Sequence, residues 1–84
     1  MSYFVYVIQS KIDQRLYKGL AKDISKRIKE HNSGKNFSTK PYIPWILVYS
    51  KEFDDLSEAR KWEKYLKSGS GREFLKSYLK NMSI

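Results

Sequence analysis

Hydrophobic and polar positions along the chain follow two different periods, which predict strands alternating with helices. Residues 3–10, YFVYVIQS, carry β-branched and aromatic side chains on both parities, as is typical of a central strand buried on both faces. After the turn KIDQ, RLYKG at 15–19 predicts a short return strand, and WILVYSKEF at 45–53 predicts a third. Pro41 and Pro44 precede the third strand, where no ladder donor is required.

Three other segments have the spacing of helices. DISKRIKEHNSG predicts a helix that Asp23 caps and Gly34 ends. A second helix is expected from Asp55 or Ser57 through EARKWEKYLK, with SGSG at 68–71 as a break. REFLKSYLK then predicts a last helix with one apolar side, which carries Phe74, Leu75, Tyr78 and Leu79. The expected fold is α/β of the α+β type: a small, mainly antiparallel sheet of three strands flanked by three helices.

Length and composition limit the choices further. The 84 residues are enough for one core, so a single domain over 1–84 is expected. No apolar run approaches the ~20 residues of a membrane span, and the amino terminus lacks a signal-peptide pattern, so a cytoplasmic location is expected. With no cysteine and one histidine, the chain cannot build a disulfide framework or a thiolate and imidazole zinc site.

The charge balance points to a polyanionic partner. Lysine and arginine number 17 against 9 acidic residues, which gives a formal net charge of +8. Such a basic small domain suits nucleic acid, because each phosphate that it neutralises releases condensed counterions. The alternative is that the lysines only solvate a small protein. Charge alone does not separate binding from cutting.

Both longer helices carry ionisable groups on the face that should be apolar. Positions i, i+3, i+4 and i+7 of the first helix include Arg27 and His31, and the same set in the second includes Glu63. A desolvated charge without a partner costs several kcal/mol, so each must meet a cleft, a metal or an opposite charge. Structural explanations exist for each: Glu63 could pair with Lys67, Arg27 could extend its head into water, and His31 could cap a helix end.

Two tyrosines on the first hairpin complete a recognisable pattern. FVY at 4–6, followed eleven positions later by Tyr17, Lys18 and Gly19, resembles the two halves of the GIY-YIG signature of a nuclease superfamily. The arginine and histidine of the first helix, EHNSG, the PW before the third strand and the EARKWE helix also match. The resemblance covers nearly the whole chain and is closest to the small single-domain bacterial members. Taken singly, the tyrosines would be core residues with bonded hydroxyls.

The sequence departs from that pattern at Phe4, in place of the first glycine, and at Lys18, in place of the central isoleucine. Because side chains alternate along a strand, Lys18 should point away from the face that Tyr17 uses, and Phe4 should share the face of Tyr6. Gly19 should allow backbone or substrate to approach closely.

The resemblance implies a metal-dependent endonuclease that hydrolyses phosphodiester bonds, with DNA expected as substrate. Glu63 would be the one protein carboxylate on a single divalent ion, Mg²⁺ or Mn²⁺, because a two-metal site would need more carboxylates. Arg27 would hold the phosphate with its planar fork. Tyr6 is expected to orient or deprotonate the attacking water, its pKa lowered by the cation and the arginine, while Tyr17 and His31 position the phosphate or relay the proton.

Contacts to nucleic acid are expected from lysines near the helix ends and the loop around the proposed cleft, namely Lys22, Lys26, Lys35, Lys40 and Lys67. Two other classes of function stay open: a nucleic-acid-binding module whose nuclease site is weak or depends on a partner, and a protein-interaction domain, which the charge disfavours. A protein partner could supply substrate recognition. The choice between DNA and RNA, linear and branched substrates, and the oligomeric state is not fixed by these residues.

Overall fold

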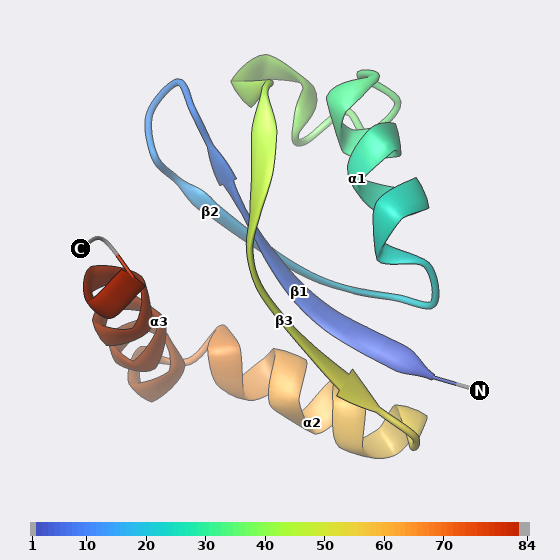
Figure 1. Ribbon diagram of the computed structural model, residues 1–84, viewed down its shortest axis with the longest axis vertical. Helices are drawn as coiled ribbons and strands as arrows, with labels where there is room; N and C mark the ends of the chain where they lie inside the picture. Colours follow the sequence, from blue (N-terminus) through green and yellow to red (C-terminus); the bar gives the residue numbers. More distant parts are fainter. Residues whose placement is uncertain (1, 83–84) are drawn as a thin grey trace.

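The computed structural model describes residues 2–82, which form one antiparallel sheet with helices on both faces (Figure 1). Strand β1, Tyr3–Ser10, lies between β2, Leu16–Ala21, and β3, Trp45–Phe53. The predicted three-stranded sheet is confirmed. Strand β2 starts one residue later than expected and runs two residues further, because its last two residues continue to pair with β1.

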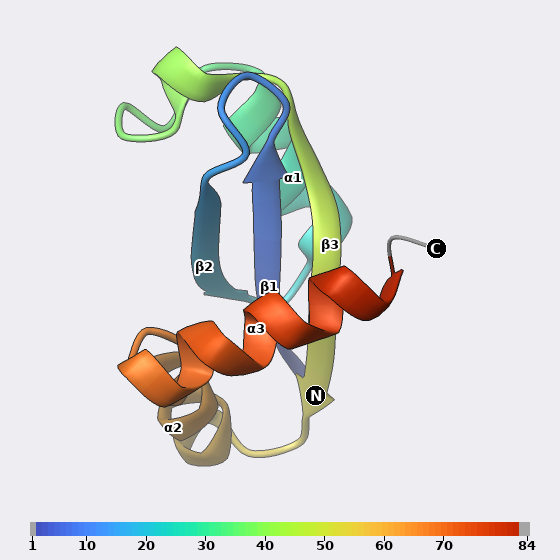
Figure 2. The ribbon, with the colours of Figure 1, turned by 90° about the vertical axis from the view of Figure 1, so that its left-hand side faces the viewer.

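The central strand is buried on both faces, as its sequence predicted. Val5 and Val7 are fully buried on one face and pack with residues of the second and third helices. Tyr6 and Ile8 are buried on the other face, where the first helix packs. Figure 2 shows the first helix behind the sheet and the third in front of it. The sheet therefore separates two hydrophobic clusters.

Local capping explains where the first two helices begin. Helix α1, Ile24–Asn32, starts after Asp23, whose carboxylate accepts a hydrogen bond from the Lys26 N–H at 3.1 Å. Helix α2, Leu56–Leu66, starts after Asp55, which accepts from the backbone N–H of Ser57. Gly34 has a φ of 83°, which suits the end of a helix. A short 3₁₀ helix, η1, Lys40–Tyr42, lies in the loop that leads to β3.

The last helix differs from its prediction. Helix α3 spans Gly69–Met82, so it begins inside the SGSG segment that was expected to be a break. A Cβ at Gly71 would lie 2.0 Å from the carbonyl oxygen of Tyr65, so glycine allows the first turn of α3 to contact the end of α2. The Ser68 hydroxyl accepts from the Gly71 N–H at 3.2 Å. Within residues 2–82 no helix is long and apolar enough to cross a membrane.

Candidate active site

The side chain of Tyr6 lies against a glycine of the neighbouring strand β2. Its register partner on β2 is Gly19, and a Cβ at that position would lie 2.4 Å from the Tyr6 hydroxyl oxygen and 2.5 Å from the ring. Any side chain at position 19 would therefore displace the phenol. The close approach at this glycine is thus made by the side chain of Tyr6, which is 1% exposed, whereas backbone or substrate was expected there.

A chain of hydrogen bonds connects Tyr6 to the loop after α1. The Tyr6 hydroxyl lies 3.0 Å from Nε2 of His31, and Nδ1 of His31 lies 2.8 Å from Oγ1 of Thr39. The Thr39 hydroxyl donates to the carbonyl oxygen of Asn36 at 3.4 Å. We infer that the hydroxyl accepts from His31 Nδ1–H, which leaves Nε2 to accept from Tyr6. His31 is thus oriented to receive a proton from the phenol.

The surrounding protein shifts the pKa values of His31 and Tyr6 in opposite directions. Burial, and then the Arg27 charge, lower the pKa of His31, so the imidazole is neutral at pH 7. Burial, with a smaller effect of Tyr17, raises the pKa of Tyr6 to about 12, although Arg27 acts in the lowering direction. The prediction of a lowered Tyr6 pKa is wrong for the protein's own groups, because desolvation of the phenol outweighs the arginine.

Tyr17 lies on the same face of the sheet and completes the aromatic cluster. Its ring packs edge-on against His31 with centroids 4.9 Å apart, and against Trp45 at 6.4 Å. The structure therefore brings Tyr6, Tyr17 and His31 into one contact group. The alternative that His31 only caps a helix end does not fit, because its side chain is buried and bonded on both nitrogens.

Residues outside the predicted site hold this group in place. The side-chain amide of Asn32 bonds the backbone of Trp45 twice, at 2.7 and 3.0 Å, and Trp45 Nε1 donates to the Thr39 carbonyl at 2.9 Å. Asn32 and Trp45 lie in the EHNSG and PW segments that match the family pattern, whereas Thr39 lies in a polar loop, where threonine indicates only a turn. The partners of Thr39 lie on α1 and β3, so only the tertiary structure identifies its role.

Arg27 lies at the solvent boundary of the cluster, with 45% of its side chain exposed and its guanidinium 3.2 Å from Glu30. It borders two open grooves. One, of about 260 Å³, also has Lys22 and Lys26 in its lining; the other, of about 440 Å³, has His31 and Lys35. Arg27 can therefore reach an anion in either groove, and the charge of Glu30 competes for it.

Glu63 approaches from α2. Its side chain is 22% exposed, and its carboxylate lies 3.5 Å from Nζ of Lys67. Its charge is near enough to Tyr6 to act on the pKa of the phenol. In the part of the chain described here, no group of three or more His, Cys, Asp or Glu side chains could hold a metal. One half-buried carboxylate fits a hard cation such as Mg²⁺, which keeps several waters and takes few protein ligands.

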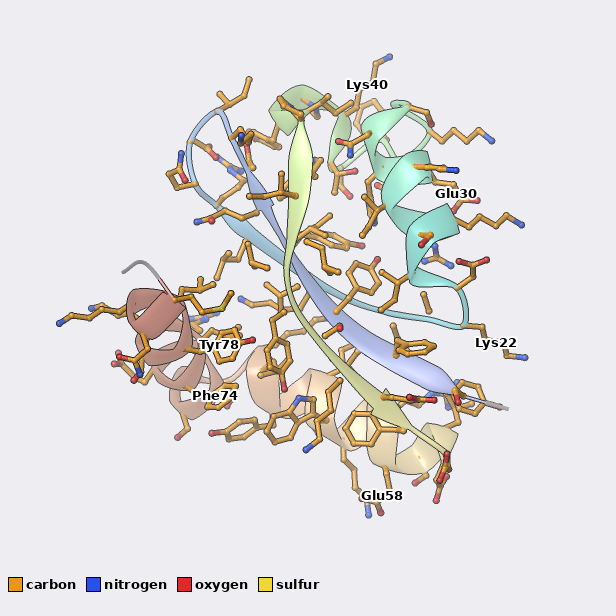
Figure 3. The ribbon with its side chains drawn as sticks, viewed as in Figure 1. Lys22, Glu30, Lys40, Glu58, Phe74 and Tyr78 are labelled. Atoms are coloured by element: carbon orange, nitrogen blue, oxygen red, sulfur yellow. The ribbon has the colours of Figure 1, made fainter. Side chains whose placement is uncertain are left out.

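The predicted lysines fall in two places. Lys22, Lys26, Lys35 and Lys40 surround α1, and Figure 3 shows Lys22 and Lys40 near opposite ends of that helix with Glu30 between them. Lys67 caps α2 on the other side of the sheet. The lysines around α1 adjoin the Arg27 grooves, whereas Lys67 adjoins Glu63.

The GIY-YIG catalytic domain model matches residues 2–78. The chain belongs to the GIY-YIG family. It is 44% identical over 75 residues to a UPF0213 protein of Staphylococcus saprophyticus, covering 88% of this chain and 90% of that protein. It is 38% identical over 80 residues to UPF0213 protein YsiG of Lactococcus lactis, covering 94% and 76%.

A solved structure supports the same placement. The solution NMR structure of a UPF0213 protein from Bacillus halodurans is 36% identical, covers 92% of this chain and 84% of that chain, and superposes with a TM-score of 0.57. The GIY-YIG fold expected from the sequence is confirmed. The GIY-YIG family is one of nucleases, which act on nucleic acid and generally use a divalent metal.

Proposed function

We propose that this GIY-YIG protein is a metal-dependent endonuclease that hydrolyses phosphodiester bonds in DNA. The observation that carries the proposal is the buried Tyr6–His31–Thr39 chain, placed beside a partly exposed arginine and within electrostatic range of Glu63. These groups supply a proton relay, a phosphate clamp and one carboxylate. Together they match the needs of phosphodiester hydrolysis.

The raised pKa of Tyr6 favours a concerted proton transfer. In the protein without a bound ion, burial raises the pKa of Tyr6 to about 12, so a standing phenolate is disfavoured at pH 7. Instead, Tyr6 passes its proton to Nε2 of His31 as it takes one from the attacking water. His31 can accept that proton because it is neutral and its Nδ1–H is held by Thr39.

The remaining groups handle charge and position. Arg27 binds a non-bridging oxygen of the phosphate and stabilises the charge that grows there, in place of its pairing with Glu30. Tyr17 keeps the imidazole plane in place from the side. Glu63 would hold the divalent ion, which when bound stabilises negative charge on the phosphoryl and leaving oxygens. The leaving oxygen departs as its bond to phosphorus breaks and takes up a proton from solvent.

One observation favours a second candidate, a nucleic-acid-binding module whose nuclease site is weak or depends on a partner. Both charged residues of the site are already paired, Arg27 with Glu30 at 3.2 Å and Glu63 with Lys67 at 3.5 Å. If substrate alone does not displace these pairs, a partner would be needed. Both pairs are partly exposed and therefore weak, which favours the active enzyme.

A cleavage assay tests the proposal. The wild-type protein is incubated with labelled single-stranded, duplex and branched DNA, and with RNA, in magnesium, manganese or EDTA. We expect cleavage of DNA with either metal and none in EDTA. Tyr6→Phe should lower the rate about 100-fold or more, whereas Tyr78→Phe, on α3, should leave it unchanged. Binding without cleavage in every condition would support the second candidate instead.

A further inference from the structure

One positive charge lies on the otherwise apolar face of β2. Leu16 and Leu20 pack against the hydrophobic cluster beneath α2 and α3. Lys18 stands between them, and its register partner Val7 is fully buried in the same cluster. Because side chains alternate along a strand, Lys18 shares the face of these residues, opposite the face of Tyr17. This confirms the orientation expected for the lysine that replaces the isoleucine of the family pattern.

Two further cations approach the same place from the helices. Leu66 and Leu75 belong to the cluster that buries Val7. Lys67 directly follows Leu66, and Arg72 precedes Leu75 by one turn on α3. Figure 2 shows α3 beginning on the β2 side of the sheet and crossing toward β3. The charges of both Lys67 and Arg72 act on Lys18, so we group the three residues as the β2–α2–α3 cation cluster.

These charges repel one another with little compensation. The pKa of Lys18 is lowered by burial and then by the charges of Arg72 and Lys67. Among the ion pairs of residues 2–82, only Lys67 of this cluster has a carboxylate partner, Glu63. A half-buried amine beside two cations costs the fold stability. An anion bound at this edge would remove that cost.

We propose that the β2–α2–α3 cation cluster binds a backbone phosphate of the nucleic acid, on the opposite face of the sheet from Tyr6 and Tyr17. The proposal rests on the proposed function, which makes nucleic acid the partner. Lys67 belongs to this cluster and also pairs with Glu63 at 3.5 Å, so the bound strand would pass around the β2 edge directly beside the candidate metal ligand. The phosphate bound at this cluster would be a different phosphate of the strand from the one that is cleaved.

Binding and stability measurements on single-charge variants test the site. Lys18→Met keeps the stem and removes the charge, and Arg72→Gln removes the charge of a residue exposed on α3. Lys61→Met is the matched control, because Lys61 is also a cation on α2 but is 72% exposed and pairs with Glu58. Affinity for a labelled DNA duplex is measured in EDTA, between about 50 and 200 mM salt. Urea unfolding is followed for the same proteins.

Lys18→Met and Arg72→Gln should each weaken binding about fivefold to tenfold near 0.1 M salt, and each should reduce the slope of log K against log salt by about one. Lys61→Met should change affinity less than about twofold. Lys18→Met should also unfold at higher urea than the wild type, because it relieves the repulsion. If Lys18→Met does not fold, the Arg72→Gln affinity decides.

Three results would overturn the proposal: affinities for Lys18→Met and Arg72→Gln equal to that of Lys61→Met, an unchanged salt slope, or stabilisation of the wild type by inorganic phosphate with DNA affinity insensitive to both substitutions. The last would assign the cluster to a small anion. Because binding is measured in EDTA, a protein that binds but never cleaves would refute the proposed hydrolysis and still report on the cluster.

Discussion

Thr39→Val should remove the acceptor that fixes the orientation and tautomer of His31 while keeping the shape of the side chain. Both residues are 1% exposed, and the bond from His31 Nδ1 to Thr39 Oγ1 measures 2.8 Å. Valine leaves the buried N–H without a partner, which costs about 1–3 kcal/mol. The 3.4 Å bond from Thr39 to Asn36 is long and adds little.

Thr39→Ser is the matched control, because it keeps the hydroxyl and loses only one methyl group, worth about 0.8 kcal/mol. Thr39→Val should therefore unfold at a lower urea concentration than Thr39→Ser, by about 1 M for a domain with a slope near 1 kcal/mol/M. Without the acceptor, the imidazole proton moves to Nε2, and this nitrogen can then no longer accept a hydrogen bond from Tyr6. The cleavage rate should fall about 10- to 100-fold.

The assays are urea unfolding by circular dichroism, single-turnover cleavage, and nitrogen NMR of the imidazole, which reports which ring nitrogen carries the proton. Thr39→Ser should keep the Nδ1–H form and most of the rate. The reasoning fails if Thr39→Val matches Thr39→Ser in urea, keeps the Nδ1–H form, or cleaves equally fast.

Two further substitutions and one pH dependence follow from the same geometry. Arg27→Lys should cut the cleavage rate strongly and leave DNA affinity almost intact, because a point charge holds phosphate without the planar fork; equal small losses in rate and affinity would make Arg27 a binding residue only. Gly19→Ala places a methyl group 2.4 Å from the Tyr6 hydroxyl, so it should destabilise the protein and abolish cleavage, and a fully active variant would contradict the placement of Tyr6. Because the pKa of His31 is lowered in the folded protein, the stability that its neutral form contributes is present above about pH 6.5 and is lost as the pH falls through the folded-state pKa. Denaturant titrations of the wild type at several pH values should show this loss. If the same loss persists in His31→Gln, another group causes it.

Much of the fold follows from local signals in the sequence. The strands at 3–10 and 45–53 have the expected bounds, and Asp23 and Asp55 cap their helices, because alternation and capping depend on near neighbours. The SGSG segment is helical from Gly69 where a break was expected, because glycine disfavours a helix locally, whereas here Gly71 permits contact between α2 and α3.

The candidate site was predicted less completely. His31 and Glu63 were marked as unusual because each is ionisable and lies on the face of a helix that should be apolar. In the structure His31 is buried and Glu63 is partly buried. Thr39 had no such mark, since its role depends on a contact eight residues away across a loop. The direction of the Tyr6 pKa also escaped prediction, because it depends on how deeply the phenol is buried.

The cleavage rate of Glu63→Gln in magnesium tests the central proposal most directly. Glutamine keeps the shape and removes the carboxylate proposed to hold the divalent ion, and an amide oxygen is a far weaker ligand for magnesium. Melting curves with and without magnesium, run on the same preparations, check that the variant is folded and should show that metal-dependent stabilisation shrinks. If Glu63 only pairs with Lys67 at 3.5 Å, the change should cost a few tenths of a kcal/mol and leave cleavage intact. We predict that cleavage disappears in a folded Glu63→Gln protein; cleavage at the wild-type rate would contradict the account.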